Sequence, residues 1–152
     1  MPTEPPTCPR APLSWGELID KITILEIKSE RLTTPEALQN VRHELHLLDN
    51  VIGEIATLPP RLLELKSELR SVNQRLWEIE DAIRGKEAQK LFDEEFIELA
   101  RSVYITNDER GRIKRNIDLL LNSAVVEEKQ YVRYESERNG SALKRPSGAE
   151  HD

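Results

Sequence analysis

The sequence predicts an all-α fold, a bundle of four to five long amphipathic helices. The composition is 38% apolar and 33% charged but only 5% aromatic, a bias typical of long helices and coiled coils. Apolar residues also recur alternately three and four positions apart over most of the chain, which is the period of one helix face. We expect one helical domain over residues 13–138, between a disordered, proline-rich leader over 1–12 and a disordered tail over 139–152.

The first helix is expected to begin after Ser14 and to end near Leu32. Ser14 and Glu17 form a capping box, in which each side chain satisfies a free amide group at the helix start. Apolar residues lie on two sides of this helix, so it is either central in the bundle or shared with a second copy. We therefore expect a homo-oligomer, most simply a two-fold dimer.

Two helices with continuous apolar seams are expected next. Thr34 is a good N-cap, and Pro35 suits the first helical position because its fixed φ fits a helix. Pro59 and Pro60 end this helix, since proline lacks the amide donor and clashes with the preceding turn. The short connection predicts an antiparallel helical hairpin of about residues 35–57 and 60–91.

The fourth helix is expected to begin at its N-cap Asp93 and to reach about Leu121. A fifth, shorter helical segment is expected from about Val125 to Glu137.

Polar residues interrupt the apolar stripes in the middle of the fourth helix. A bundle helix normally keeps its inward stripe apolar, and inward polar groups cost stability unless something satisfies them. The third helix carries a polar line beside its own seam, and the first helix adds charged residues. The candidate ligand-binding residues are Asn73, Trp77, Glu80, Arg84, Tyr104, Asn107, Arg110 and Lys114, with Asp20, Lys21 and Lys28 as secondary candidates.

These residue types favour an anionic ligand. Arginine and lysine side chains meet phosphate or carboxylate groups, and aromatic rings stack on a ring or sugar face. Arg110 and Lys114 lie four apart on one helix, so they would repel each other unless an anion lay between them. The expected ligand is an anionic small molecule or a sugar nucleotide. The alternative is structural, since such stripes also form solvated ion-pair faces or a buried network that fixes helix register.

Several partner and cofactor classes are not expected. The net charge of −6 argues against a protein that binds nucleic acid through a basic face. No apolar stretch approaches the ~18 residues that span a bilayer, and the N-terminal residues do not form a signal peptide, so we expect a cytoplasmic protein without membrane contact. His43 and His46 lack further ligands for a metal site, and no motif indicates a cofactor.

Four groups of residues carry a resemblance to a known family. They are Leu13-Ser14 with Gly16–Lys28, Leu76–Asp81 with Ile83-Arg84, Phe96–Tyr104 with Asn107, Arg110 and Lys114, and Val126–Lys129 with Tyr131. Together they resemble a family of small uncharacterised bacterial proteins, classed as a domain of unknown function, over roughly residues 13–134. The resemblance implies a bacterial helical protein with no established activity, found beside cell-surface polysaccharide functions.

A shorter run, Leu18–Ile22 with Arg31, is similar to the first helix of all-helical chorismate mutases. That similarity implies a dicarboxylate held between helices by cations such as Arg84, Arg110 and Lys114. Thr23 stands where those enzymes carry the second acidic residue of an Ile-Asp repeat, and this departure puts the similarity in doubt.

Three classes of function remain open at this point. The first is a binding or accessory protein with a polar, anion-friendly pocket between helices. The second is a structural or adaptor protein that docks another polypeptide. The third is a small helical enzyme of the chorismate-mutase type, for which Glu80 is the plausible general acid or base. We favour binding over catalysis, and no catalytic residue is assigned.

Overall fold

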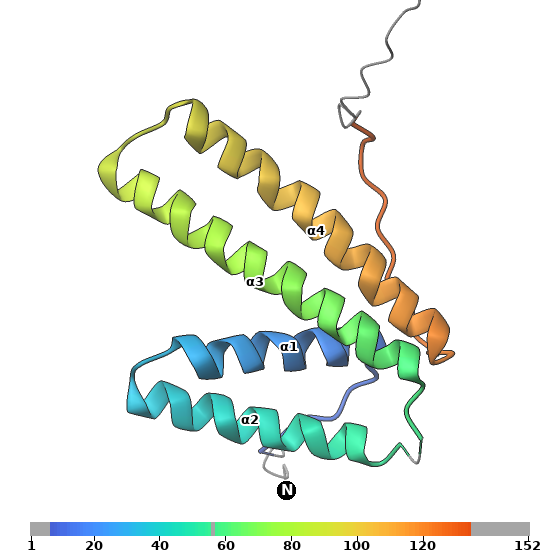
Figure 1. Ribbon diagram of the computed structural model, residues 1–152. Helices are drawn as coiled ribbons and strands as arrows, with labels where there is room; N and C mark the ends of the chain where they lie inside the picture. The colour runs from blue at the N-terminus through green and yellow to red at the C-terminus, as the bar shows by residue number, and fades with distance from the viewer. Residues whose placement is uncertain (1–6, 56, 135–152) are drawn as a thin grey trace, which may run out of the picture.

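The computed structural model describes residues 7–55 and 57–134, and within these ranges the protein is all-helical, as predicted. Its four helices are α1 (Trp15–Arg31), α2 (Pro35–Gly53), α3 (Pro60–Gln89) and α4 (Glu94–Leu120). Figure 1 shows that α1 and α2 form one hairpin and that the longer α3 and α4 form a second. None of these helices is both long enough and apolar enough to cross a lipid bilayer. The tail expected over 139–152 and the first half of the expected leader lie outside the described residues.

The prediction that residues 35–57 and 60–91 form a helical hairpin is wrong, because these two helices do not pack against each other. Within the described residues, α2 packs along α1, and α3 packs along α4. The described residues between α2 and α3, 54–55 and 57–59, are not helical, and Pro59 has an extended backbone with ψ 138°. This is the conformation that a residue before proline prefers, and it leads the chain away from α2 instead of reversing it tightly. An apolar seam shows that a helix face is buried, but it does not specify the partner helix.

Helix α1 lies at the centre of the fold. It packs against α2, α3 and α4, and the apolar residues on both of its sides are buried within the chain, except for Ile24, which is partly buried. The N-terminal half of α3 and the C-terminal half of α4 cross α1 to form the main core, which consists of Ile19, Leu62, Leu65, Leu69, Val72, Ile113 and Ile117. The two apolar sides of α1 therefore need no second copy to cover them.

The distal half of the α3–α4 hairpin projects beyond α1 (Figure 1). Lys90 ends α3 in the left-handed conformation, with φ 57°, and the Leu91 amide donates to the Lys86 carbonyl at 3.0 Å in a Schellman-type turn. Asp93 then caps α4 as expected, since its carboxylate accepts from the Phe96 amide at 3.0 Å. In this distal half, the seam residues Ile79 and Ile83 are only partly buried.

The expected fifth helix is also wrong over its described part. Residues 122–134, here called the C-terminal strap, run back along α4 without helical structure (Figure 1). Asp118 of α4 accepts from the Glu127 amide at 2.8 Å, and Arg115 donates to the Glu127 carbonyl at 3.0 Å. Side chains of α4 thus pair backbone groups that a helix would pair internally. The end of the expected segment, residues 135–137, lies outside the described residues.

Candidate functional site

Asp20 of α1 is the centre of a buried polar cluster. The residue is 1% exposed. Its carboxylate accepts two hydrogen bonds from Arg110 of α4, from Nε at 2.9 Å and from Nη2 at 2.5 Å, and one from Asn73 Nδ2 of α3 at 2.9 Å. Asn73 Nδ2 also donates to Thr23 Oγ1 at 2.9 Å, and the Thr23 hydroxyl donates to the Asp20 carbonyl at 2.8 Å. This cluster joins all three helices and fixes the orientation of the Arg110 side chain.

The two-pronged contact with Asp20 keeps Arg110 charged. Hydrogen bonding to Asp20 raises the pKa of Arg110 above its ordinary value, and this effect outweighs the opposing effect of burial. A paired arginine with fork geometry has no freedom to turn toward another anion without losing both bonds. Its remaining terminal nitrogen, Nη1, points to Asn107 Oδ1 at 3.4 Å.

Two further polar contacts between α1 and α4 lie toward the start of α1. The Lys114 ammonium contacts Glu17 at 2.5 Å and Glu127 of the strap at 3.2 Å. The buried Asp118 carboxylate accepts from the Gly16 amide at 2.6 Å, which satisfies one of the free amides at the start of α1. The residues of α1 therefore meet those of α4 in reverse order along the chain, so α1 and α4 run antiparallel. The pairs are Gly16 with Asp118, Glu17 with Lys114 and Asp20 with Arg110.

The expectation that Arg110 and Lys114 share an anionic ligand is not supported by these contacts, because each cation has carboxylate partners of its own. Lys114 is 7% exposed. Burial opposes its charge most strongly, yet the hydrogen bond to Glu17 and the charges of Asp20, Glu17 and Glu127 together raise its pKa above 10.5. Carboxylates of the chain itself therefore balance the positive charges of Arg110 and Lys114.

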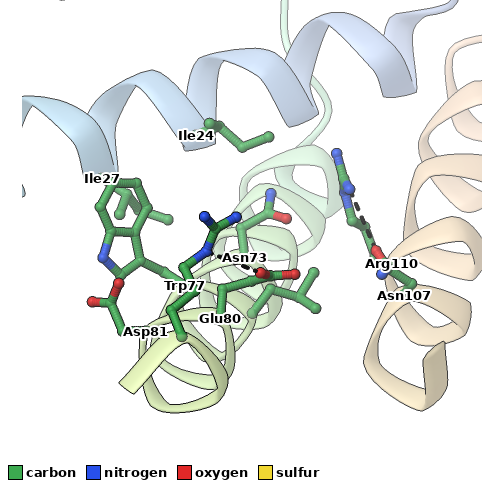
Figure 2. A pocket seen from close by; sticks show the side chains of 10 residues that line it. Ile24, Ile27, Asn73, Trp77, Glu80, Asp81, Asn107 and Arg110 are labelled. Carbon is green, nitrogen blue, oxygen red and sulfur yellow. Dashed lines mark hydrogen bonds and ion pairs between the residues drawn. The ribbon is translucent and has the colours of Figure 1, made fainter. Parts of the chain in front are cut away.

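A cleft of about 540 Å³ opens beside the Asp20 cluster, between α1, α3 and α4. Figure 2 shows Ile24 and Ile27 on the α1 side, Trp77, Glu80 and Asp81 on α3, and Asn107 and Arg110 on α4. Six of the candidate residues named from the sequence line this one cleft. They are Asn73, Trp77, Glu80, Arg84, Asn107 and Arg110.

The other candidates lie elsewhere. Tyr104 is 43% exposed, and its ring packs edge-on against Tyr134 of the strap at 5.1 Å between ring centres. Lys114 is buried at the start of α1, as described above. Lys21 forms an ion pair with Glu44 of α2 at 2.9 Å, and Lys28 is partly buried near the end of α1. None of these four residues lines the cleft.

The strap supports the α4 wall of the cleft from behind. Lys129 Nζ donates to the Asn107 carbonyl at 2.8 Å, and the Lys129 side chain lies against Gly111. The Tyr134 hydroxyl donates to Asp108 at 2.7 Å. These contacts hold the strap against the turns of α4 that carry Asn107 and Arg110.

Several residues in or near the site were not among the candidates named from the sequence. Asp118 lies on the same polar stripe as Asn107 and Lys114, and this continuity is a signal that it would be buried with them. Asp81 follows Glu80 directly and lines the same cleft. Gly16 and Glu127 show no spacing signal, because their roles depend on where α1 and the strap cross α4.

The charges around the cleft are nearly balanced, with a small acidic excess. The carboxylates of Glu80 and Asp81 and the guanidinium groups of Arg84 and Arg110 line the cleft, and Asp20 adds a carboxylate that pairs with Arg110. Among the described residues, no three His, Cys, Asp or Glu side chains are grouped closely enough to hold a metal ion. The arrangement offers fixed hydrogen-bonding groups, an indole ring and apolar side chains, which are the components of a small-molecule site.

Comparison with known proteins identifies a family without an assigned activity. No curated protein and no solved structure matches the chain. The family match covers residues 10–142, which includes all four helices and the described strap. The chain therefore belongs to the family of unknown function DUF6165.

Proposed function

We propose that the protein binds a small polar molecule in the cleft between α1, α3 and α4, and acts as a binding or accessory protein. One observation carries this proposal. Asp20 fixes Arg110 through two hydrogen bonds, which leaves Arg110 Nη1 and Asn107 on one wall of the cleft and Trp77 on another (Figure 2). In binding sites, the polar groups that contact the ligand are usually held in place by hydrogen bonds to buried residues behind them.

The size and lining of the cleft support this function. Its volume of about 540 Å³ lies within the range of typical small-molecule sites. Ile24, Ile27, Leu76 and the Trp77 ring provide apolar surface, while Asn107 and Arg110 provide oriented donors. A hydroxylated ring such as a sugar has matching apolar and polar faces. The implied link to cell-surface polysaccharide metabolism remains part of this proposal.

The geometry favours the sugar portion of a sugar nucleotide over its phosphates. A phosphate would have to compete with Asp20 for Arg110, and Lys114 does not line the cleft. The same pairing gives little support to an enzyme of the chorismate-mutase type, because binding a dicarboxylate requires cations that are free to meet it.

Ligand binding can be tested by fluorescence and thermal unfolding. Trp15 and Trp77 are the two tryptophans, so a Trp15→Phe variant leaves Trp77 as the only indole reporter, and it lines the cleft. A panel of neutral sugars, amino sugars, phosphosugars, sugar nucleotides and dicarboxylates would be screened. A ligand at about 100 times its Kd should stabilise the native state by about 2.7 kcal/mol and should change the Trp77 emission.

A matched pair of variants assigns the binding to the cleft. Asn107→Leu replaces an amide on the cleft wall, whereas Asn116→Leu makes the same change at an exposed position of α4 outside the cleft. We expect the first variant to lose the ligand-induced stabilisation and the second to retain it. The proposal fails if no compound of the panel binds, or if Asn107→Leu binds as well as the unmodified protein.

A second candidate function, a structural role through self-association, is favoured by apolar side chains at the distal end of the α3–α4 hairpin. Leu91, Phe92 and Ile97 are exposed there. The seam between the two helices continues toward this end through Ile79 and Ile83, which are only partly buried. Two such hairpins placed face to face would complete a four-helix bundle, so the partner proposed for this surface is a second copy of the chain.

A further inference from the structure

The α3 wall of the cleft carries several groups that attract positive charge, beside the apolar side chain of Leu76. Glu80 and Asp81 contribute carboxylates, and the Trp77 ring contributes a negative π face. Asn73 is 5% exposed, and its Nδ2 is already occupied by Asp20 and Thr23. Within the described part of the chain, no hydrogen bond reaches Asn73 Oδ1, so this buried side chain offers the cleft an unpaired acceptor.

Arg84 is the one cationic residue on the α3 side of the cleft, and its side chain is weakly held. Its Nε lies 3.6 Å from Glu80 Oε2, one helical turn away, and its side chain is 77% exposed. An exposed ion pair of this kind contributes little to stability, because water screens the two charges. A ligand cation could therefore displace Arg84 from Glu80 at little cost.

The opposite wall offers donors but no uncompensated positive charge. Asp20 neutralises Arg110 and leaves its Nη1 beside Asn107. Asn107 Oδ1 accepts from that nitrogen, so the Asn107 amide nitrogen remains to donate. A ligand that satisfies both walls thus has a hydrogen-bond acceptor, such as a hydroxyl or carbonyl oxygen, toward α4. Toward α3 it has a positively charged hydrogen-bond donor.

We propose that the cleft selects a small organic cation, an amine-bearing ring or chain whose ammonium group replaces the Arg84 guanidinium beside Glu80 and contacts the Trp77 ring. This inference rests on the proposed function, because it names the ligand class of the same cleft. Tryptophan is the aromatic residue that binds cations best, and burial against carboxylates adds to that attraction. Arg84 acts as an internal competitor, a cation on the protein that occupies the place of the ligand cation.

Three sugars that differ in one charged group test the ligand class. D-glucosamine is cationic at about pH 6, below the ordinary pKa of such amines, while D-glucose is neutral and D-glucose 6-phosphate is anionic. Binding would be measured by titration of the Trp77 fluorescence in the Trp15→Phe protein. We expect D-glucosamine to bind at least about 10-fold more tightly than either other sugar, which corresponds to about 1.4 kcal/mol.

Two variants on the α3 wall are expected to change the affinity for D-glucosamine in opposite directions. Arg84→Ala removes the competitor and should tighten D-glucosamine binding by about 3- to 10-fold, whereas Glu80→Gln removes the carboxylate and should weaken it by about 10-fold. Arg42→Ala makes the same charge change as Arg84→Ala at an exposed position of α2, and it should leave the affinity unchanged. Circular dichroism would verify that each variant folds.

Each other outcome has a distinct meaning. Preferential binding of D-glucose 6-phosphate that weakens in Arg84→Ala would overturn the cation inference but leave the proposed binding function standing. Equal binding of D-glucose and D-glucosamine would have the same consequence. If none of the three sugars and no compound of the larger panel binds, both the inference and the proposed function are overturned.

Discussion

The backbone of Gly16, at the start of α1, lies directly against the carbonyl oxygen of Lys114 in α4. A Cβ atom at this position would overlap that oxygen and would lie 2.8 Å from Asp118 Oδ1. Both obstacles belong to a packed helix or a fully buried side chain, so neither can move freely. This close approach allows the Gly16 amide to reach Asp118 and fixes how α1 crosses α4.

Three glycine substitutions test this relationship. Gly16→Ala should destabilise the protein by about 1–3 kcal/mol or more, because the two helices must separate. Gly85→Ala should instead stabilise it by about 0.5–1 kcal/mol, since nothing lies within 4 Å of its Cβ position and alanine favours a helix. Gly111→Ala should be close to neutral, because its neighbour is the flexible end of Lys129. Urea unfolding measures all three, and a tolerated Gly16→Ala would refute the close packing.

The Asp20–Arg110 pair should carry a large share of the stability. Asp20→Ala leaves the partly buried Arg110 without its partner, which costs about 3–5 kcal/mol in comparable buried pairs. Asp20→Asn retains an acceptor oxygen and should cost less. Glu30 lies on α1, like Asp20, and forms an exposed ion pair with Arg70 of α3. Glu30→Ala should therefore cost less than about 1 kcal/mol. Equal losses for Asp20→Ala and Glu30→Ala in urea unfolding would contradict the assigned role of the buried cluster.

The sequence predicted the helices well because their signals are local. Capping by Ser14 and Asp93, the Pro59-Pro60 break and the three-and-four spacing depend on neighbouring residues, and the observed helices follow them closely. The pairing of helices is not local. The seams of α2 and α3 indicate buried faces of similar character, and only the central position of α1 determines which face meets which partner.

The polar site was predicted in composition but not in its internal pairing. The stripe containing Asn73 and Trp77 and the stripe containing Asn107 and Arg110 do line one cleft. Helical spacing could not reveal that Asp20 neutralises Arg110, because this contact joins residues 90 positions apart. The strap was missed for a related reason. Residues 125–134 have helical propensity, but Asp118 and Arg115 of α4 pair the backbone amide and carbonyl of Glu127, which a helix would pair internally.

Self-association through the distal hairpin is expected to depend on Ile97. Light scattering should detect a dimer at micromolar concentration, and Ile97→Glu should shift it to a monomer by placing a charge in the apolar contact. Leu63→Glu introduces the same side chain at an exposed leucine near the start of α3, and the protein should remain a dimer by light scattering. A strict monomer for the unmodified protein, or a dimer that Leu63→Glu disrupts equally, would exclude this surface as the interface.

Lys114 links stability to alkaline pH. Lys114→Met leaves Glu17 and Glu127 without their shared cation, so we expect a loss of about 1–3 kcal/mol near neutral pH. The pKa of Lys114 is raised in the folded state, so the native protein holds this proton more tightly than the unfolded chain does. Its contribution is therefore fully present below the unfolded pKa near 10.5 and is lost as pH rises through the higher folded value.

Urea unfolding of the unmodified protein and of Lys114→Met, from about pH 8 to about pH 11, measures this dependence. The stability difference between the two should be constant up to about pH 10 and should then shrink, because only the unmodified protein loses a stabilising proton. Lys21→Met provides the control, since its ion pair with Glu44 is exposed and contributes only about 0–1 kcal/mol. If Lys114→Met were instead more stable than the unmodified protein near neutral pH, Lys114 would be a strained cation awaiting an external anion, and the internal pairing described here would not be its role.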